Sequence, residues 1–110
     1  MPKAVLIVQS QASDESREDE YHKWYEHTHI PQLCEIPGIV SARRFTLAGG
    51  GFGPADPSVP AHLAIYELDA DDLDGVMSEV ITRTGDGRIE MSDAIALDPV
   101  PTTLLYVERD

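Results

Sequence analysis

Three short segments of this chain are apolar on both faces of a predicted β-strand, and this property limits the folds open to it. The segments are rich in Val, Leu, Ile and Tyr, which favours strands, and they span residues 3–10, 61–68 and 102–108. Within the second segment, for example, Leu63 and Ile65 share one face while Tyr66 lies on the other. Because both faces are apolar, both must be covered by other parts of a protein.

The segments between these strands predict the rest of the fold. A helix is expected to start at Ser13 or Asp14 and to weaken, turn or end at Pro31, and Pro37-Gly38 is expected to end the segment. A strand follows at residues 39–47. A second helix is expected from Ala70 to about Thr84, capped by Asp69 and ended by Gly85. We expect irregular chain after it, with one short helix started by Ser92-Asp93.

The resulting order, β-α-β-β-α-β, is the ferredoxin-like pattern of the α+β class. It predicts one domain over residues 1–110, with a four-stranded antiparallel sheet and two main helices on one face. Two helices cover only one face of such a sheet. The other apolar face therefore predicts a homodimer that associates sheet against sheet.

Composition excludes several classes of partner. The formal net charge is −12, from 20 acidic and 8 basic residues, and such a surface repels phosphate backbones and anionic lipid. No apolar run approaches the length of a membrane span, and no targeting segment is visible. The single cysteine, Cys34, forms no internal disulfide. We therefore expect a soluble cytoplasmic protein without nucleic-acid or membrane partners.

The richest chemistry lies at the end of the first predicted helix, in the run from Trp24 to Pro31. At about 100° per residue, Trp24 and Tyr25 fall on the apolar arc with His29 at its edge, whereas His27 points to solvent. An imidazole beside aromatic rings fits three interpretations. His29 packs and caps the helix end, or it transfers protons in a small-molecule pocket, or it binds a metal.

The metal interpretation uses the helical spacing of His22, Glu26 and His29, but no fourth ligand is evident. We therefore expect no metal and no cofactor. In the pocket interpretation, Tyr25 and Tyr66 supply hydroxyls that orient an oxygenated substrate. His62, on the same predicted face as Tyr66, is expected to be a solvated histidine at the strand end.

Arg43 and Arg44 are neighbours on a predicted strand, so their side chains point to opposite faces of the sheet. One of them is expected to reach the pocket or the dimer partner, where a guanidinium holds a carboxylate or phenolate. The alternative for both is an ion pair at the surface or at an interface of a very acidic protein.

These residues resemble a known pattern. The run Trp24-Tyr25-x-x-x-His29-Ile30-Pro31, then Ile36-Pro37-Gly38-Ile39-Val40 and Arg43-Arg44-Phe45, resembles the EthD-like branch of the dimeric α/β-barrel proteins. The resemblance implies a ferredoxin-like subunit that dimerises through its sheets, with a pocket between sheet and helices. Relatives include isomerases, cyclases, decarboxylases and cofactor-free oxygenases of small oxygenated compounds. The match carries His29 over as the proton-transfer residue, with Trp24 and Tyr25 as pocket wall.

The sequence thus predicts a cofactor-independent enzyme that transfers protons on a small cyclic or aromatic oxygenated compound. The alternative is a dimeric binding or accessory protein without catalysis, because no second catalytic group stands beside His29. The predicted catalytic residue is His29. The predicted substrate-binding residues are Trp24, Tyr25, Tyr66, Arg43, Arg44 and His22.

Overall fold

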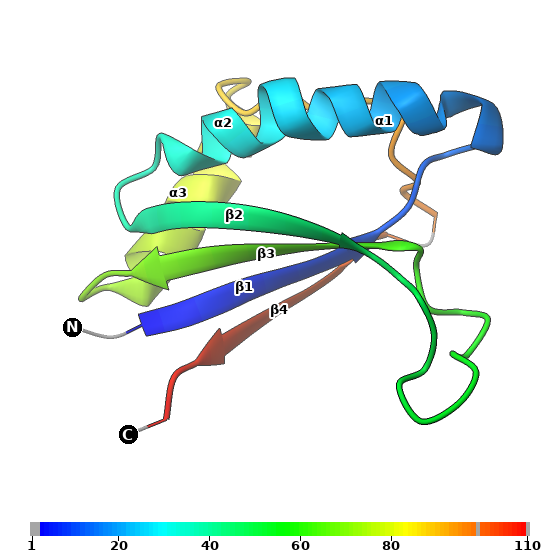
Figure 1. The fold of residues 1–110 in the computed structure, drawn as a ribbon. Coiled ribbons are helices and arrows are strands. Elements are labelled where there is room, and N and C mark those ends of the chain that lie inside the picture. The colour runs from blue at the N-terminus through cyan, green and yellow to red at the C-terminus, as the bar shows by residue number, and fades with distance from the viewer. Residues whose placement is uncertain (1–2, 99, 110) are drawn as a thin grey trace.

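The computed structural model describes residues 3–98 and 100–109 and is built on one four-stranded sheet (Figure 1). The strands are β1 (Lys3–Ser10), β2 (Ile39–Thr46), β3 (His62–Asp69) and β4 (Thr102–Val107). Their order across the sheet is β2-β3-β1-β4, and every neighbouring pair is antiparallel. This is the ferredoxin-like arrangement, so the predicted fold class is confirmed.

All the helices lie on one side of the sheet (Figure 1). A nearly continuous rod is formed by η1 (Glu15–Arg17), α1 (Glu18–Trp24), η2 (Tyr25–His29) and α2 (Ile30–Cys34), and α3 (Leu73–Gly85) follows β3. The core lies between these helices and the sheet face that carries Ala4, Ala64, Tyr66 and Leu68. The alternating pattern predicted for residues 61–68 is therefore observed, with Leu63 and Ile65 on the opposite face.

Of the alternatives for Pro31, an end of the helix there is wrong, because the helical rod continues to Cys34 and ends before Pro37-Gly38. The reason is η2, one turn of π-helix in which the N–H of Ile30 bonds to the carbonyl of Tyr25, five residues back. Proline lacks an N–H, and its ring clashes with the preceding turn of an α-helix. The wider π turn directly before Pro31 relieves both problems, so the chain passes the proline without leaving the helical path.

Gly38 closes the turn that leads from the rod into β2. Its φ is +102°, a conformation that side chains disfavour, and a Cβ at this position would lie 2.8 Å from Cγ2 of Val76 on α3. The Pro37-Gly38 pair therefore lets the turn and α3 approach closely.

Two local predictions for the second half of the chain are wrong. The cap of α3 is Asp72, whose carboxylate accepts a hydrogen bond from the N–H of Gly75 at 2.9 Å, and Asp69 instead ends β3. Ser92-Asp93 starts no helix in the described part of residues 88–98, because the Ser92 hydroxyl accepts the N–H of Ala94 in a local turn.

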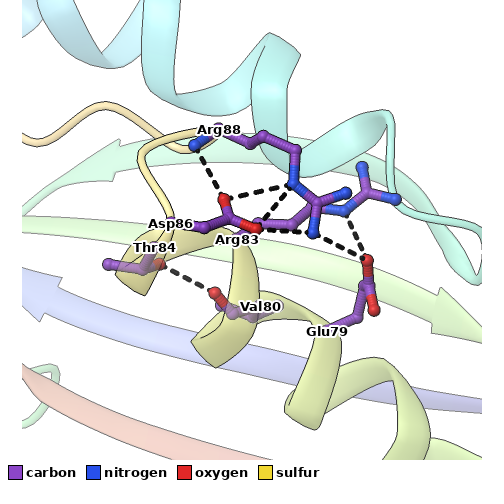
Figure 2. Close-up of polar contacts among 6 residues, drawn as sticks. All are labelled: Glu79, Val80, Arg83, Thr84, Asp86 and Arg88. Carbon is purple, nitrogen blue, oxygen red and sulfur yellow. Dashed lines mark hydrogen bonds and ion pairs between the residues drawn. The ribbon is translucent and has the colours of Figure 1, made fainter.

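A polar network fixes the chain where it leaves α3 (Figure 2). Arg83 pairs with Glu79 one turn earlier at 2.7 Å, and Arg88 pairs with Asp86 at 2.8 Å. The Thr84 hydroxyl donates to the Val80 carbonyl at 2.8 Å. Such pairs at a surface contribute little to stability.

The sheet face away from the helices carries an apolar strip. Its central row runs across three strands through Ile65, Ile7 and Leu104, which are paired neighbours, and Arg43 completes the row on β2. β4 is exposed at every position, and no described helix covers it. Among the described residues, no helix is long and apolar enough to cross a membrane.

Candidate functional site

Three tyrosine rings fill the space between the helical rod and the sheet. Tyr21 and Tyr25 come from the rod, Tyr66 comes from the centre of β3, and all three are fully buried. The Tyr21 hydroxyl shares a 2.6 Å hydrogen bond with the hydroxyl of Ser10 on β1. Burial raises the pKa of all three phenols, so each hydroxyl keeps its proton at neutral pH.

The two neighbouring arginines separate as their strand position requires. Arg44 points toward the rod, and its guanidinium carbon lies 4.4 Å from the ring centroid of Tyr25 and 5.3 Å from that of Tyr21. Arg43 lies on the opposite face over the ring of Phe45. Arg44 is therefore the arginine that faces the helical rod.

The only hydrogen bond of the Arg44 side chain to another described residue goes from Nη1 to Nδ1 of His22, at 2.9 Å. No described carboxylate lies within ion-pair distance of it. Within the described part of the chain, its guanidinium therefore meets two tyrosine rings and a ring nitrogen of His22, and no carboxylate.

His29 is the last residue of the π turn, and its ring packs between two aromatic rings. Its ring stacks on Trp24 with centroids 4.4 Å apart and meets Tyr25 edge-on at 5.2 Å. Trp24 is itself fixed by a hydrogen bond from Nε1 to the carbonyl of Glu90. Burial lowers the pKa of His29 to about 4, so the ring is neutral at neutral pH.

Three buried polar atoms around Tyr25 have no hydrogen-bond partner among the described residues. They are Nδ1 of His29, Nε of Arg44 and the hydroxyl of Tyr66. His29 and Arg44 both contact the Tyr25 ring, and Tyr25 is close enough to contribute to the raised pKa of Tyr66. Buried groups without partners are rare and costly, so this concentration marks the region for a function other than packing.

A second polar group lies at the start of the rod. His62, only 7% exposed, meets Glu18 with Nε2 and Oε1 2.5 Å apart, and Nε2 of His22 lies 3.4 Å from the same oxygen. His62 lowers the pKa of Glu18, which is therefore ionised. The expectation that His62 is a solvated residue at a strand end is wrong, because the rod covers the start of β3.

The residues proposed for a metal from helical spacing do not form the donor group found in the structure. Within residues 3–98 and 100–109, the one group of three close metal-binding side chains is Glu18, His22 and His62. Glu26 and His27 are exposed. Two of the three donors, Glu18 and His22, are four residues apart on one helix and so share a face, while His62 was recognisable in the sequence only as a residue on the Tyr66 face.

Four surface cavities have no lining residue from the tyrosine layer, and one of them, of about 570 Å³, is lined by Trp24, His27 and Thr28 among others. One of about 470 Å³ lies at the edge of the sheet near Tyr106 and Lys3, and one of about 220 Å³ is lined by His62, Thr46 and apolar residues of the following loop. None of these four cavities is lined by Tyr25, Tyr66 or His29. The predicted pocket between sheet and helices therefore stays a prediction.

The two central hydroxyls give opposite expectations for stability. Tyr66→Phe removes a buried hydroxyl without a partner and should raise the free energy of unfolding by about 1 kcal/mol. Tyr21→Phe breaks the bond to Ser10 and should lower it by about 1 kcal/mol. Urea unfolding of both variants checks this pair. If Tyr66→Phe were the more destabilising, the Tyr66 hydroxyl would have a partner in solution.

Comparison with known proteins supports the fold. The structure matches that of an ethyl tert-butyl ether D (EthD) family protein from Bacillus halodurans C-125, with a TM-score of 0.61 and 16% sequence identity. The match covers 99% of this chain and 100% of the other. No protein-family model and no curated protein matches the sequence. The chain is thus an α+β protein of the ferredoxin-like class. Within that class its fold is that of the EthD family protein, as the sequence motif predicted.

Proposed function

We propose that the protein binds a small cyclic or aromatic oxygenated compound beneath the π turn and transfers a proton on it without a cofactor. The observation that carries this proposal is the set of buried polar atoms without partners around Tyr25. Hydrogen-bond capacity that the folded chain leaves unused is available to a ligand. Because tyrosine rings fill this region, a ligand enters only when one or more of them moves.

Arg44 defines the charge of the compound. A guanidinium that faces the interior without a carboxylate partner favours an anion, and its flat fork matches a carboxylate, phenolate or enolate. The Tyr66 hydroxyl keeps its proton and can donate to the same oxygen. Together these groups would stabilise negative charge as it develops on the bound compound.

His29 defines the direction of proton transfer in this proposal. At neutral pH its ring is uncharged, so it accepts a proton and cannot donate one as an imidazolium. Trp24 and Tyr25 hold the ring from two sides, which fixes its orientation. Abstraction of a proton next to a carbonyl or lactone, as in an isomerisation, is the step that these groups would support.

The adjacent arginines provide a matched test. Thermal shifts are measured with aromatic acids, lactones and phenols for the wild type, Arg44→Met and Arg43→Met. A ligand that stabilises the wild type and Arg43→Met, but not Arg44→Met, supports the site. Equal stabilisation of all three variants would contradict it.

Turnover then separates the enzyme from a binding protein. A ligand recovered as product from the wild type and unchanged from His29→Gln supports proton transfer by His29. A ligand recovered unchanged from both supports the alternative, a binding or accessory protein that uses the same residues.

We also propose that the protein is a homodimer joined through the uncovered sheet face. Leu104 and Tyr106 on this face are 43% and 54% exposed, and apolar side chains exposed together on one face mark a site of association. Leu104→Asp should give a monomer in light scattering, because a carboxylate in the interface loses its water. Ile81→Asp, which changes an exposed Ile on α3, should remain dimeric. A monomeric wild type would contradict this arrangement.

A further inference from the structure

We propose that Glu18, His22 and His62 form a binding site for a divalent transition-metal ion, and we use Zn²⁺ as the ion to test it. The proton transfer proposed above uses His29, seven residues after His22, and needs no metal. The site therefore goes beyond that function and does not depend on it. It joins the first turn of α1 to the start of β3, two segments more than 40 residues apart in the chain.

The donor atoms are spaced for one small ion. One ring nitrogen of each histidine and one carboxylate oxygen of Glu18 all lie within 4.8 Å of one another. Two ligands of a tetrahedral zinc, each at about 2.0–2.1 Å from the ion, are roughly 3.3 Å apart. The separation of His22 Nε2 and Glu18 Oε1 is 3.4 Å, close to that value. Glu18 is half-exposed, so its carboxylate can withdraw from His62 as the ion replaces the shared proton.

His62 already has the outer contact that a metal-binding histidine needs. Its Nδ1 lies 3.3 Å from the hydroxyl of Thr46, which can accept a proton from that nitrogen. With the proton on Nδ1, the lone pair of Nε2 is free for a metal. Two imidazoles and one carboxylate favour zinc and its neighbours over Mg²⁺ or Ca²⁺, which prefer oxygen ligands.

Arg44 disfavours metal binding by His22, the third ligand of the site. It donates to Nδ1 of His22, so the ring keeps its proton on Nε2, the atom that would bind the metal. For the ion to bind, this proton must leave Nε2 and Nδ1 must become the donor, and Arg44 has no acceptor. Metal binding and the Arg44–His22 hydrogen bond therefore exclude each other, and Arg44 lowers the affinity of the site.

The competition gives a test that an accidental surface site would not pass. Zn²⁺ binding is measured by competition with a coloured chelator, Co²⁺ absorption reports the ligands, and Mg²⁺ serves as the non-binding ion. We expect one Zn²⁺ per chain, weakened about tenfold or more in Glu18→Gln and His62→Asn. Arg44→Gln should tighten binding, because the amide oxygen can accept the proton of His22 Nδ1. His27→Gln, at an exposed histidine on the same rod, should bind as the wild type does.

Several results would overturn the proposal. Failure of the wild type to bind Zn²⁺, binding by Glu18→Gln as tight as that of the wild type, or loss of binding in His27→Gln would each contradict the site. Weaker binding in Arg44→Gln would overturn the competition. Circular dichroism is used to check that each variant folds. If the buried substitution His62→Asn prevents folding, the result for Glu18→Gln decides. The thermal-shift and turnover tests of the proposed function are run with a metal chelator. A negative result in those tests is therefore independent of a negative result for Zn²⁺ binding.

Discussion

Trp24→Ala should lower the free energy of unfolding by about 3–5 kcal/mol, the range for removing a large buried aromatic side chain. Trp24 is almost fully buried, stacks on His29 and donates a hydrogen bond to the Glu90 carbonyl. The indole thus joins the helical rod to the segment that follows α3. Since a domain of this size is stable by about 5–15 kcal/mol, the variant should lose a large part of its stability in urea unfolding.

Two further aromatic variants serve as comparisons for Trp24→Ala. Trp24→Phe keeps a ring against His29 and loses the hydrogen bond, so its destabilisation should be clearly smaller than that of Trp24→Ala. Phe52→Ala removes an aromatic ring that is fully exposed in the loop before β3 and should leave stability unchanged. If Trp24→Ala were as stable as Phe52→Ala, the rod would not depend on the indole.

The fold was predictable because its signals are local and repeated. Strands with apolar residues on both faces, in the order β-α-β-β-α-β, leave few arrangements that bury their side chains. The errors occur where a contact distant in sequence or an unusual helix decides the outcome. Pro31 should have ended a regular α-helix, but the π turn before it lets the rod continue. Asp69 and Asp72 are equally good caps in sequence, and the extension of β3 to Asp69 left the role to Asp72.

The candidate site was predictable in part, for the same reason. Helical periodicity placed Trp24, Tyr25 and His29 together, and strand alternation put Arg43 and Arg44 on opposite faces, so that one of them was expected to reach the pocket or the dimer partner. The sequence did not show which arginine it is, because that depends on the register of β2 against β3. Nor did it show that His62 meets Glu18, since only the packed rod brings together residues 44 positions apart.

Acid should destabilise the protein through His29. The unfolded chain binds a proton at an ordinary histidine pKa of about 6.5, while the folded chain binds it only near 4. Between these values the unfolded state holds more protons, so stability falls as pH decreases through 6.5 and levels off below 4. From pH 7.5 to 4.5 this one group should cost about 2.5 kcal/mol. The group facing it from each side is a neutral ring, Trp24 or Tyr25, so no nearby charge offsets the loss.

His29→Phe isolates this contribution, because it keeps a stacked ring and removes the titration. In urea unfolding at pH 7.5 and 4.5, the variant should lose about 2.5 kcal/mol less than the wild type. Carboxylates such as Glu18, whose lowered pKa also favours the folded state at neutral pH, titrate in both proteins and cancel in the comparison. His27→Phe, at an exposed position two residues earlier, should keep the full acid sensitivity of the wild type. Equal losses in His29→Phe and the wild type would mean that His29 binds its proton as readily in the folded protein as in the unfolded chain, and that burial does not lower its pKa.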